Sequence, residues 1–233
     1  MVSGSLRRYF NSLLDLAKRG GIDAVISHTP ILEERFVAGG WGLGRYPFAA
    51  IDFLIVGPAD DPARAHDSTD SVTALRCIAN SGALFLSRDD RPSAKRLEQE
   101  LWTAAGIEPD GTPWYCTTDT ANSDGAAVAR EAAKLSTYTL LERATHLTAR
   151  PQLTSITEND PHLLSVFSAV PVNPRRAADV NEGGAEAFLD WLLGDEAQAL
   201  IGAFRLPEHR TTFFLRREQI PHIALRCCSH RRP

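Results

Sequence analysis

The chain has 233 residues, 43% of them hydrophobic, and a formal net charge of −4 at pH 7. It can bury an ordinary core, and its length suits one large domain or two small lobes. The slightly acidic balance argues against a general nucleic-acid binder, and no apolar run is long enough to span a bilayer. The opening MVSGSLRRYF has no apolar signal-peptide core after its charges, so we expect no export signal in the chain as written.

The first half of the chain alternates helices and strands. Apolar residues recur at helical spacing in Leu6–Arg19, and Gly20-Gly21 should end that helix. The elements expected next are a strand at 22–28, a turn and short helix at 29–40, a strand at 49–58, a helix at 71–79, a strand at 82–87 and a helix at 91–105.

The second half continues the alternation. Its expected elements are a turn and short strand at 106–118, an alanine-rich helix at 126–135, a strand at 138–140 with a helix after it, a β-rich run at 163–174, and two helical pieces within 183–204 that join at Gly194. Because strands and helices alternate throughout, the class is α/β.

Two long apolar strands, DFLIVGP and FSAVPVNP, bracket a central block that can fold as its own unit. A chain that leaves one lobe, builds a second and returns needs two crossing strands. We therefore expect lobe I at 1–57 plus 166–206 and lobe II at 58–165. Order fades beyond Arg205, so 207–233 is expected to be a disordered tail.

Catalytic motifs are not recognisable in the sequence. There is no G-x-S-x-G elbow, the histidines are scattered, and GGWGLGR has neither dinucleotide nor Walker spacing, so we read it as turns around Trp41. Neighbouring acids such as Glu33-Glu34 are read as solvated. Cys227 and Cys228 with His230 could bind a metal, but the disordered-tail interpretation is preferred, and no cofactor, metal site or catalytic residue is predicted.

The remaining signal is for anion binding at the stretch GALFLSRDDRPSAK. Ser87 and Arg88 stand at a predicted strand end, just before a helix that begins near Pro92. Helix N-termini present N–H groups and a positive dipole end, and arginine offers a fork of donors suited to an oxyanion. Ser93 could add a hydroxyl. A plain salt bridge between Arg88 and the following acids, Asp89-Asp90, is an equally good interpretation.

A second candidate loop, TANSDGAAV, precedes the alanine-rich helix. Ser123, the N–H of Gly125 and the start of that helix could face the first loop across a cleft. Asp124 would repel an anion if it pointed inward, or it could simply cap the helix.

The order of several segments closely resembles the tungstate-binding solute receptors of ABC importers, the TupA-like proteins, which have the type II periplasmic-binding-protein fold. The resemblance runs from about Leu13 to about Leu206. The segments that carry it are DAVISHTPILEERFVAGGWG, DFLIVGPADDPA, SRDD, LWTAAGIEPDGTPWY, YTLLERATHL, AVPVNP and AFLDWLLGDEAQALIGAF.

This resemblance implies two α/β lobes joined by crossing strands and a cleft that binds an oxyanion without catalysis. Tungstate or molybdate would be held by hydroxyls, backbone N–H groups and one arginine, which falls on Arg88. The resemblance also implies a monomer that works with an ABC permease in the periplasm or outside the cell. Without a signal peptide, a genuine N-terminus would instead leave the chain in the cytoplasm.

The sequence departs from the family pattern at three places. An anion-binding turn and an early strand of lobe I are expected to be missing, and Tyr9-Phe10-Asn11 replaces a Gly-Thr-Gly stretch. The family's anion-binding threonine falls on Ala94, and an acid, Asp124, enters the later glycine-rich turn. Each lost donor could cost about 1–3 kcal/mol if its partner stays unpaired.

These departures keep two alternatives open. One is a degenerate or truncated family member that has lost tight binding and acts as an interaction module or has no function. The other, ranked lowest, is an enzyme on the same scaffold, because a fold does not determine a function.

Overall fold

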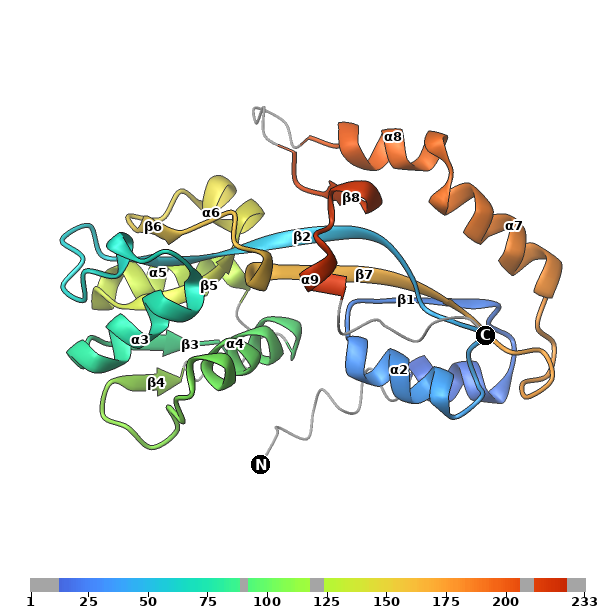
Figure 1. Ribbon diagram of the computed structural model, residues 1–233, viewed down its shortest axis with the longest axis horizontal. Helices are drawn as coiled ribbons and strands as arrows, with labels where there is room; N and C mark the ends of the chain where they lie inside the picture. The colour runs from blue at the N-terminus through green and yellow to red at the C-terminus, as the bar shows by residue number, and fades with distance from the viewer. Residues whose placement is uncertain (1–12, 89–91, 118–123, 206–211, 226–233) are drawn as a thin grey trace. The chain divides into compact units, whose positions relative to one another are not determined.

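The computed structural model describes residues 13–88, 92–117, 124–205 and 212–225 (Figure 1). The chain forms two compact units. Unit 1 comprises Met1–Ala50 and Val166–Pro233, and unit 2 comprises Ile51–Ser165.

The chain passes between the units twice, and each passage lies inside a strand. The first is within β2, Tyr46–Gly57, and the second within β7, Leu164–Pro171. Gly57 and Pro58 mark where β2 ends. The border between the two units lies earlier, after Ala50, in the middle of that strand.

Unit 1 is built on a small sheet that contains β1, β7 and the beginning of β2. β1 pairs antiparallel with β7, and Ala24 lies opposite Pro171. The other elements of unit 1 are a helix at 13–19, β1 (Ala24–Ser27), α2 (Pro30–Ala38), α7 (Glu182–Leu193), α8 (Asp195–Ala203), β8 (Leu215–Arg216), η3 (Arg217–Gln219) and α9 (His222–Leu225).

Successive residues of β7 point to opposite faces of this sheet, as strand geometry requires. Val170 packs with Phe36 of α2 and with the helix at 13–19. Ala169 packs with Phe48 and with Leu192 of α7. Helices therefore cover both faces, which explains why the run AVPV after Ser168 is apolar without alternation.

The expectation of a disordered tail at 207–233 is wrong for residues 212–225. β8 pairs antiparallel with β2, with Leu215 opposite Ala50, and Ile220 is buried beside Ala50 and Val166. This segment adds apolar surface to the core. Its many charged residues hide that burial when the sequence is considered alone. Residues 206–211 and 226–233, including Cys227, Cys228 and His230, lie outside the described residues.

The interpretation of Glu33 as a solvated acid is also wrong. Its side chain is fully buried, accepts a hydrogen bond from the N–H of Thr29 at 2.8 Å, and pairs with Arg45 Nε at 2.7 Å. The carboxylate thus joins the start of α2 to the segment that leads into β2. Buried charges are tolerated when they are paired and hydrogen-bonded in this way.

Unit 2 contains the rest of β2 and a mixed sheet with helices on both faces. Its elements are η1 (Ala65–Asp67), α3 (Ser71–Ser81), β3 (Phe85–Ser87), α4 (Pro92–Ala105), β4 (Tyr115–Thr117), α5 (Gly125–Leu135), β5 (Tyr138–Glu142), α6 (Arg143–Ala149), β6 (Thr154–Thr157) and η2 (Pro161–Leu163). β3 runs parallel to both β4 and β5, whereas β2 runs antiparallel to β5 and β6.

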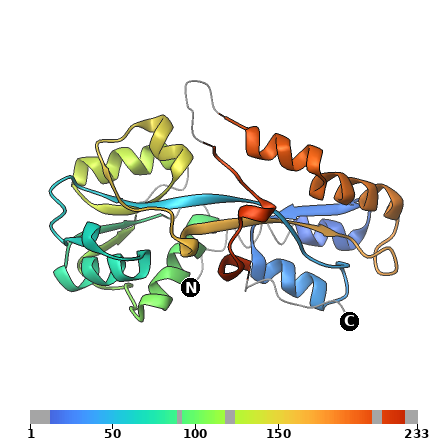
Figure 2. The same cartoon turned by 45° about the horizontal axis from the view of Figure 1, so that its top comes forward.

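The core of unit 2 has two halves, one on each face of the sheet. Phe53, Ile55 and Phe85 pack against α3 and α4, and Leu54 and Leu86 pack against α5. Figures 1 and 2 show α3 and α4 on one side of the strands and α5 and α6 on the other. The strands are buried on both faces, so the sequence shows them as continuous apolar runs.

Gly57, at the end of β2, provides a test of this packing. A Cβ at this position would lie 2.3 Å from Cδ1 of Tyr138, whose ring is fully buried. The ring cannot swing away easily, because its hydroxyl donates to Asp61 at 2.6 Å. We expect Gly57→Ala to lower the free energy of unfolding by about 1–3 kcal/mol in urea denaturation.

Gly183 in α7 is the matched control, because a Cβ there would meet nothing within 4 Å. Gly183→Ala should leave stability unchanged or raise it by up to about 1 kcal/mol, as alanine favours a helix over glycine. Equal effects of the two substitutions would contradict the packing described for Gly57.

Candidate functional site

Three parallel strands of unit 2 end at one edge of its sheet, and each is followed by a helix. β3 leads toward α4, β4 toward α5 and β5 directly into α6. The carboxyl ends of parallel strands are where open α/β sheets bind ligands, since the next helices begin there. The candidate site therefore lies at this edge of the sheet.

Arg88 is the first residue after β3, and its side chain is fully buried. Its backbone N–H donates to Glu98 Oε2 at 3.2 Å, and its guanidinium Nη1 donates to Glu142 Oε2 at 2.5 Å. Glu142 is the last residue of β5, and its side chain is 13% exposed. A buried guanidinium needs such a partner, because an uncompensated charge in the interior is very costly.

Gly125, the first residue of α5, lies beside the same guanidinium. A Cβ on Gly125 would be 3.2 Å from Arg88 Nη2 and 3.2 Å from the Thr145 hydroxyl. A side chain at this position would press on both neighbours. Glycine therefore lets the backbone at the start of α5 approach the arginine closely.

Asp124 caps α5, as one of the two interpretations of its sequence context predicted. Its carboxylate accepts a hydrogen bond from the N–H of Ala127 at 2.8 Å, and its side chain is exposed. This N-cap satisfies a donor of the first turn that the helix itself cannot satisfy.

Thr145 of α6 completes the surroundings of Arg88. Its hydroxyl lies 3.4 Å from Glu142 Oε2, which makes a long and weak hydrogen bond. The sequence reasoning missed both Thr145 and Glu142. A usable signal was present, because YTLLER is an apolar strand that ends in charged residues, like the FLSR stretch that pointed to Arg88.

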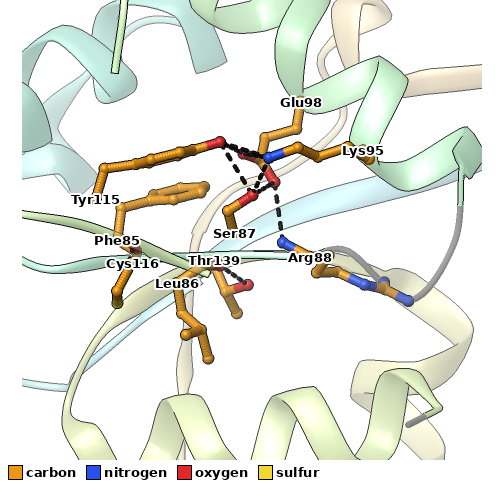
Figure 3. A network of polar contacts seen from close by, with 9 residues as sticks. All are labelled: Phe85, Leu86, Ser87, Arg88, Lys95, Glu98, Tyr115, Cys116 and Thr139. Carbon is orange, nitrogen blue, oxygen red and sulfur yellow. Dashed lines mark hydrogen bonds and ion pairs between the residues drawn. The ribbon is translucent and has the colours of Figure 1, made fainter. Parts of the chain in front are cut away.

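The hydroxyl of Ser87 belongs to a different set of contacts on the α4 side of the sheet (Figure 3). It accepts a hydrogen bond from Lys95 Nζ at 2.6 Å and donates to Glu98 Oε2 at 3.1 Å. Figure 3 shows the Ser87 hydroxyl and the Arg88 guanidinium pointing in different directions, as expected for neighbours in an extended chain. Ser87 thus supports the backbone that carries Arg88.

Tyr115 joins this set from β4, and we call Ser87, Lys95, Glu98 and Tyr115 the polar quartet. The Tyr115 hydroxyl donates to Glu98 Oε1 at 2.5 Å and accepts from Lys95 Nζ at 2.8 Å. Lys95 Nζ is 3.8 Å from Glu98 Oε1, so an ammonium and a carboxylate balance each other.

The quartet changes the proton affinities of its members. Burial raises the pKa of Glu98, although Lys95 and the hydrogen bonds to Tyr115 and Ser87 oppose the rise. Burial and the neighbouring carboxylate raise the pKa of Tyr115 well above its usual range, so the phenol stays neutral and can donate. Because Glu98 also accepts from the N–H of Arg88, the quartet fixes the end of β3.

A second arginine, Arg143, lies at the same edge but is paired elsewhere. Its guanidinium bonds to Asp52 at 2.5 Å and to Glu158 at 2.7 Å. Burial lowers the pKa of Arg143, and its hydrogen bonds to the two carboxylates outweigh that effect and leave it raised. Two carboxylates thus compensate this one positive charge.

The predicted site residues are only partly brought together by the structure. Arg88 and Gly125 are adjacent, whereas the Ser87 hydroxyl is engaged in the quartet. Ser93 lies in the first turn of α4, but its side chain is outside the described part of the structure, as are Ser123, Asp89 and Asp90. Glu142 is a partner of Arg88 that neither interpretation of the sequence had named.

Ser71, Asp160 and His162 lie together in unit 2 but do not form a hydrolytic triad. The hydroxyl of Ser71 donates to Asp160 at 2.6 Å, and His162 meets the other oxygen of that carboxylate. The serine therefore faces the acid instead of the base. Within the described residues, no group of His, Cys, Asp and Glu could hold a metal ion, and none of the helices is long and apolar enough to cross a membrane.

Comparison with known proteins identifies the family. Residues 13–196 match the PBP superfamily domain. The tungstate-binding protein TupA of Peptoclostridium acidaminophilum is 34% identical over 205 residues, which cover 86% of this chain and 70% of the relative. The chain is a TupA-like member of the PBP superfamily.

Solved structures of the family agree with the fold described above. The tungstate-binding protein TupA from Desulfovibrio alaskensis is 30% identical and superimposes with a TM-score of 0.79, covering 89% of this chain and 83% of that one. The tungstate ABC transporter protein from Geobacter sulfurreducens is 30% identical with a TM-score of 0.68, covering 83% and 82%. The predicted type II periplasmic-binding-protein fold is thus confirmed, as is the resemblance to the TupA-like proteins.

The balance of charge in the quartet gives a test of how the end of β3 is held. Lys95→Met removes the ammonium that most strongly opposes the raised pKa of Glu98. The buried carboxylate then has no cation beside it, so unfolding free energy at pH 7 should fall by about 3 kcal/mol. The double variant Lys95→Met with Glu98→Gln should recover at least half of that loss.

The pH dependence of the single variant follows from the same pKa. A carboxyl whose pKa is raised in the folded state contributes most stability at acid pH and loses it as pH rises through the folded-state value. The single and double variants should therefore be nearly equal at about pH 4 and diverge toward pH 7 in urea denaturation. A gap that is constant with pH would show that the charge of Glu98 is not responsible.

Proposed function

We propose that this chain captures a tetrahedral oxyanion, tungstate or molybdate, and delivers it to an ABC importer without changing it chemically. The observation that carries the proposal is the buried guanidinium of Arg88 beside the first residue of α5, in a chain whose relatives are named for tungstate binding. A delocalised cation and the N–H groups of a helix start together suit an anion with several oxygens.

The ligands we propose are the guanidinium of Arg88 and the backbone at Gly125, with hydroxyls from Ser93 and Ser123. Ser87 then contributes by holding the backbone of Arg88 in place, since its own hydroxyl already meets Lys95 and Glu98. Binding of this kind requires no nucleophile, no general base and no cofactor. That is consistent with a transport receptor and not an enzyme.

We propose that the protein acts as a monomer in the periplasm or at the outer surface of the membrane. There it would present its anion to a permease of the ABC type. Net charge of −4 gives no support for binding to nucleic acid.

Thermal denaturation with tungstate, molybdate and sulfate tests the proposal. A ligand that binds only the folded protein stabilises it by about 2.7 kcal/mol at a concentration one hundred times its dissociation constant. We expect a clear rise in Tm with tungstate or molybdate. If a folded sample shows no shift with any of the three anions, the chain is a family member that has lost high-affinity binding.

Arg88→Lys tests the position of the site. Lysine keeps the positive charge but loses the planar fork, so roughly two charge-assisted hydrogen bonds are weakened and affinity should fall about 100-fold by calorimetry. Arg143→Lys is the matched control at the same edge, and it should bind like the wild type because Arg143 is bonded to Asp52 and Glu158. Full affinity in Arg88→Lys would mean that the anion binds elsewhere.

A further inference from the structure

Glu142 has a feature that anion capture does not by itself explain. A carboxylate at the guanidinium that would hold an anion repels that ligand. Yet Glu142 Oε2 lies 2.5 Å from Arg88 Nη1, and the acid is placed there by the pairing of β5 with β2, in which Glu142 stands opposite Phe53. We infer that Glu142 competes with the oxyanion for Arg88 and so sets the affinity and charge preference of the site.

The inference rests on the proposed function. Its first step is that the carboxylate of Glu142 is directed to Arg88 and not to another residue. The adjacent Arg143 is turned to Asp52 and Glu158, so its charge is balanced by those carboxylates. Thr145 approaches Glu142 only at 3.4 Å. Among the described residues, Arg88 is therefore the strongly bound partner of this carboxylate.

The second step concerns the space around the guanidinium. Nη1 meets Glu142, and Nη2 faces Gly125 at the start of α5. An oxyanion that binds this guanidinium must therefore displace Glu142 from Nη1 or lie within a few ångströms of its negative carboxylate. Repulsion between the two is strong in a buried place, because low dielectric strengthens every charge interaction.

The third step is that this repulsion depends on the charge of the ligand. Coulomb energy is proportional to the product of the charges, so a dianion is penalised about twice as much in free energy as a monoanion of equal size. Tungstate and perrhenate are tetrahedral oxyanions of closely similar size that carry two and one negative charges. Glu142 should thus weaken tungstate binding more than perrhenate binding.

Glu142→Gln is the decisive variant, because the amide keeps the shape and an oxygen for Nη1 but has no charge. We expect tungstate to bind about tenfold tighter or more, and perrhenate to gain by roughly the square root of that factor, in calorimetry at fixed ionic strength. The Tm without ligand should fall, because Arg88 loses the countercharge that Glu142 provides. Glu158→Gln makes the same chemical change at the neighbouring arginine and should alter neither affinity.

Glu142→Asp provides a second test that keeps the charge and should fold if the amide variant does not. The shorter side chain holds Arg88 less closely, so tungstate should bind more tightly than to the wild type, but by less than in Glu142→Gln.

Unchanged or weaker tungstate binding in both variants would overturn the inference and make Glu142 a residue that orients Arg88 for the ligand. Equal gains for tungstate and perrhenate would also overturn it, because charge would not be the cause. If the folded wild type and the variants all fail to bind tungstate, molybdate or perrhenate, the proposed function itself fails. That result differs from binding that is merely insensitive to Glu142.

Discussion

The candidate site depends on one constraint, which is that a fully buried guanidinium at the end of β3 must be compensated. Glu142 meets that requirement at the side chain, and Glu98, from a different element, holds the backbone N–H of the same residue. Each acid in turn has its own fixed surroundings, the quartet around Glu98 and the strand pairing that places Glu142. The arginine therefore has a defined position before any ligand arrives, which reduces the ordering cost of binding.

The packing of unit 2 makes this arrangement possible. The strands are apolar on both faces, so their ends emerge from a core that excludes water, and polar groups at those ends must bond to each other or to a ligand. Gly125 adds a close approach between α5 and the guanidinium that no residue with a side chain could allow without displacement. The sheet thus brings together the start of α5, the arginine and the acid.

Much of the fold was predictable, and the physical reason is local. Apolar runs bounded by Gly, Pro and polar residues predicted β1, β2, β3, β5 and β7, because burial on both faces leaves a clear pattern in the sequence. β6 was missed, since TSIT is short and mostly polar, and β8 was missed because its two residues are recognisable only from their pairing with β2. For the candidate site, Arg88 and Gly125 were proposed from their positions in the sequence, and the structure places them side by side. Glu142 was not, because its contact spans 54 residues of chain and is visible only after β5 is placed.

The adjacent residues Glu142 and Arg143 have a consequence for how the sheet of unit 2 assembles. Each finds an opposite charge, Arg88 for the acid and Asp52 for the base. If β5 slipped by one residue in one direction, Arg143 would take the place of Glu142 beside Arg88, and in the other direction Glu142 would take the place of Arg143 beside Asp52. Either slip would replace an attractive pair with a repulsive one, so the charge order at the end of this strand favours a single alignment while the chain is still folding.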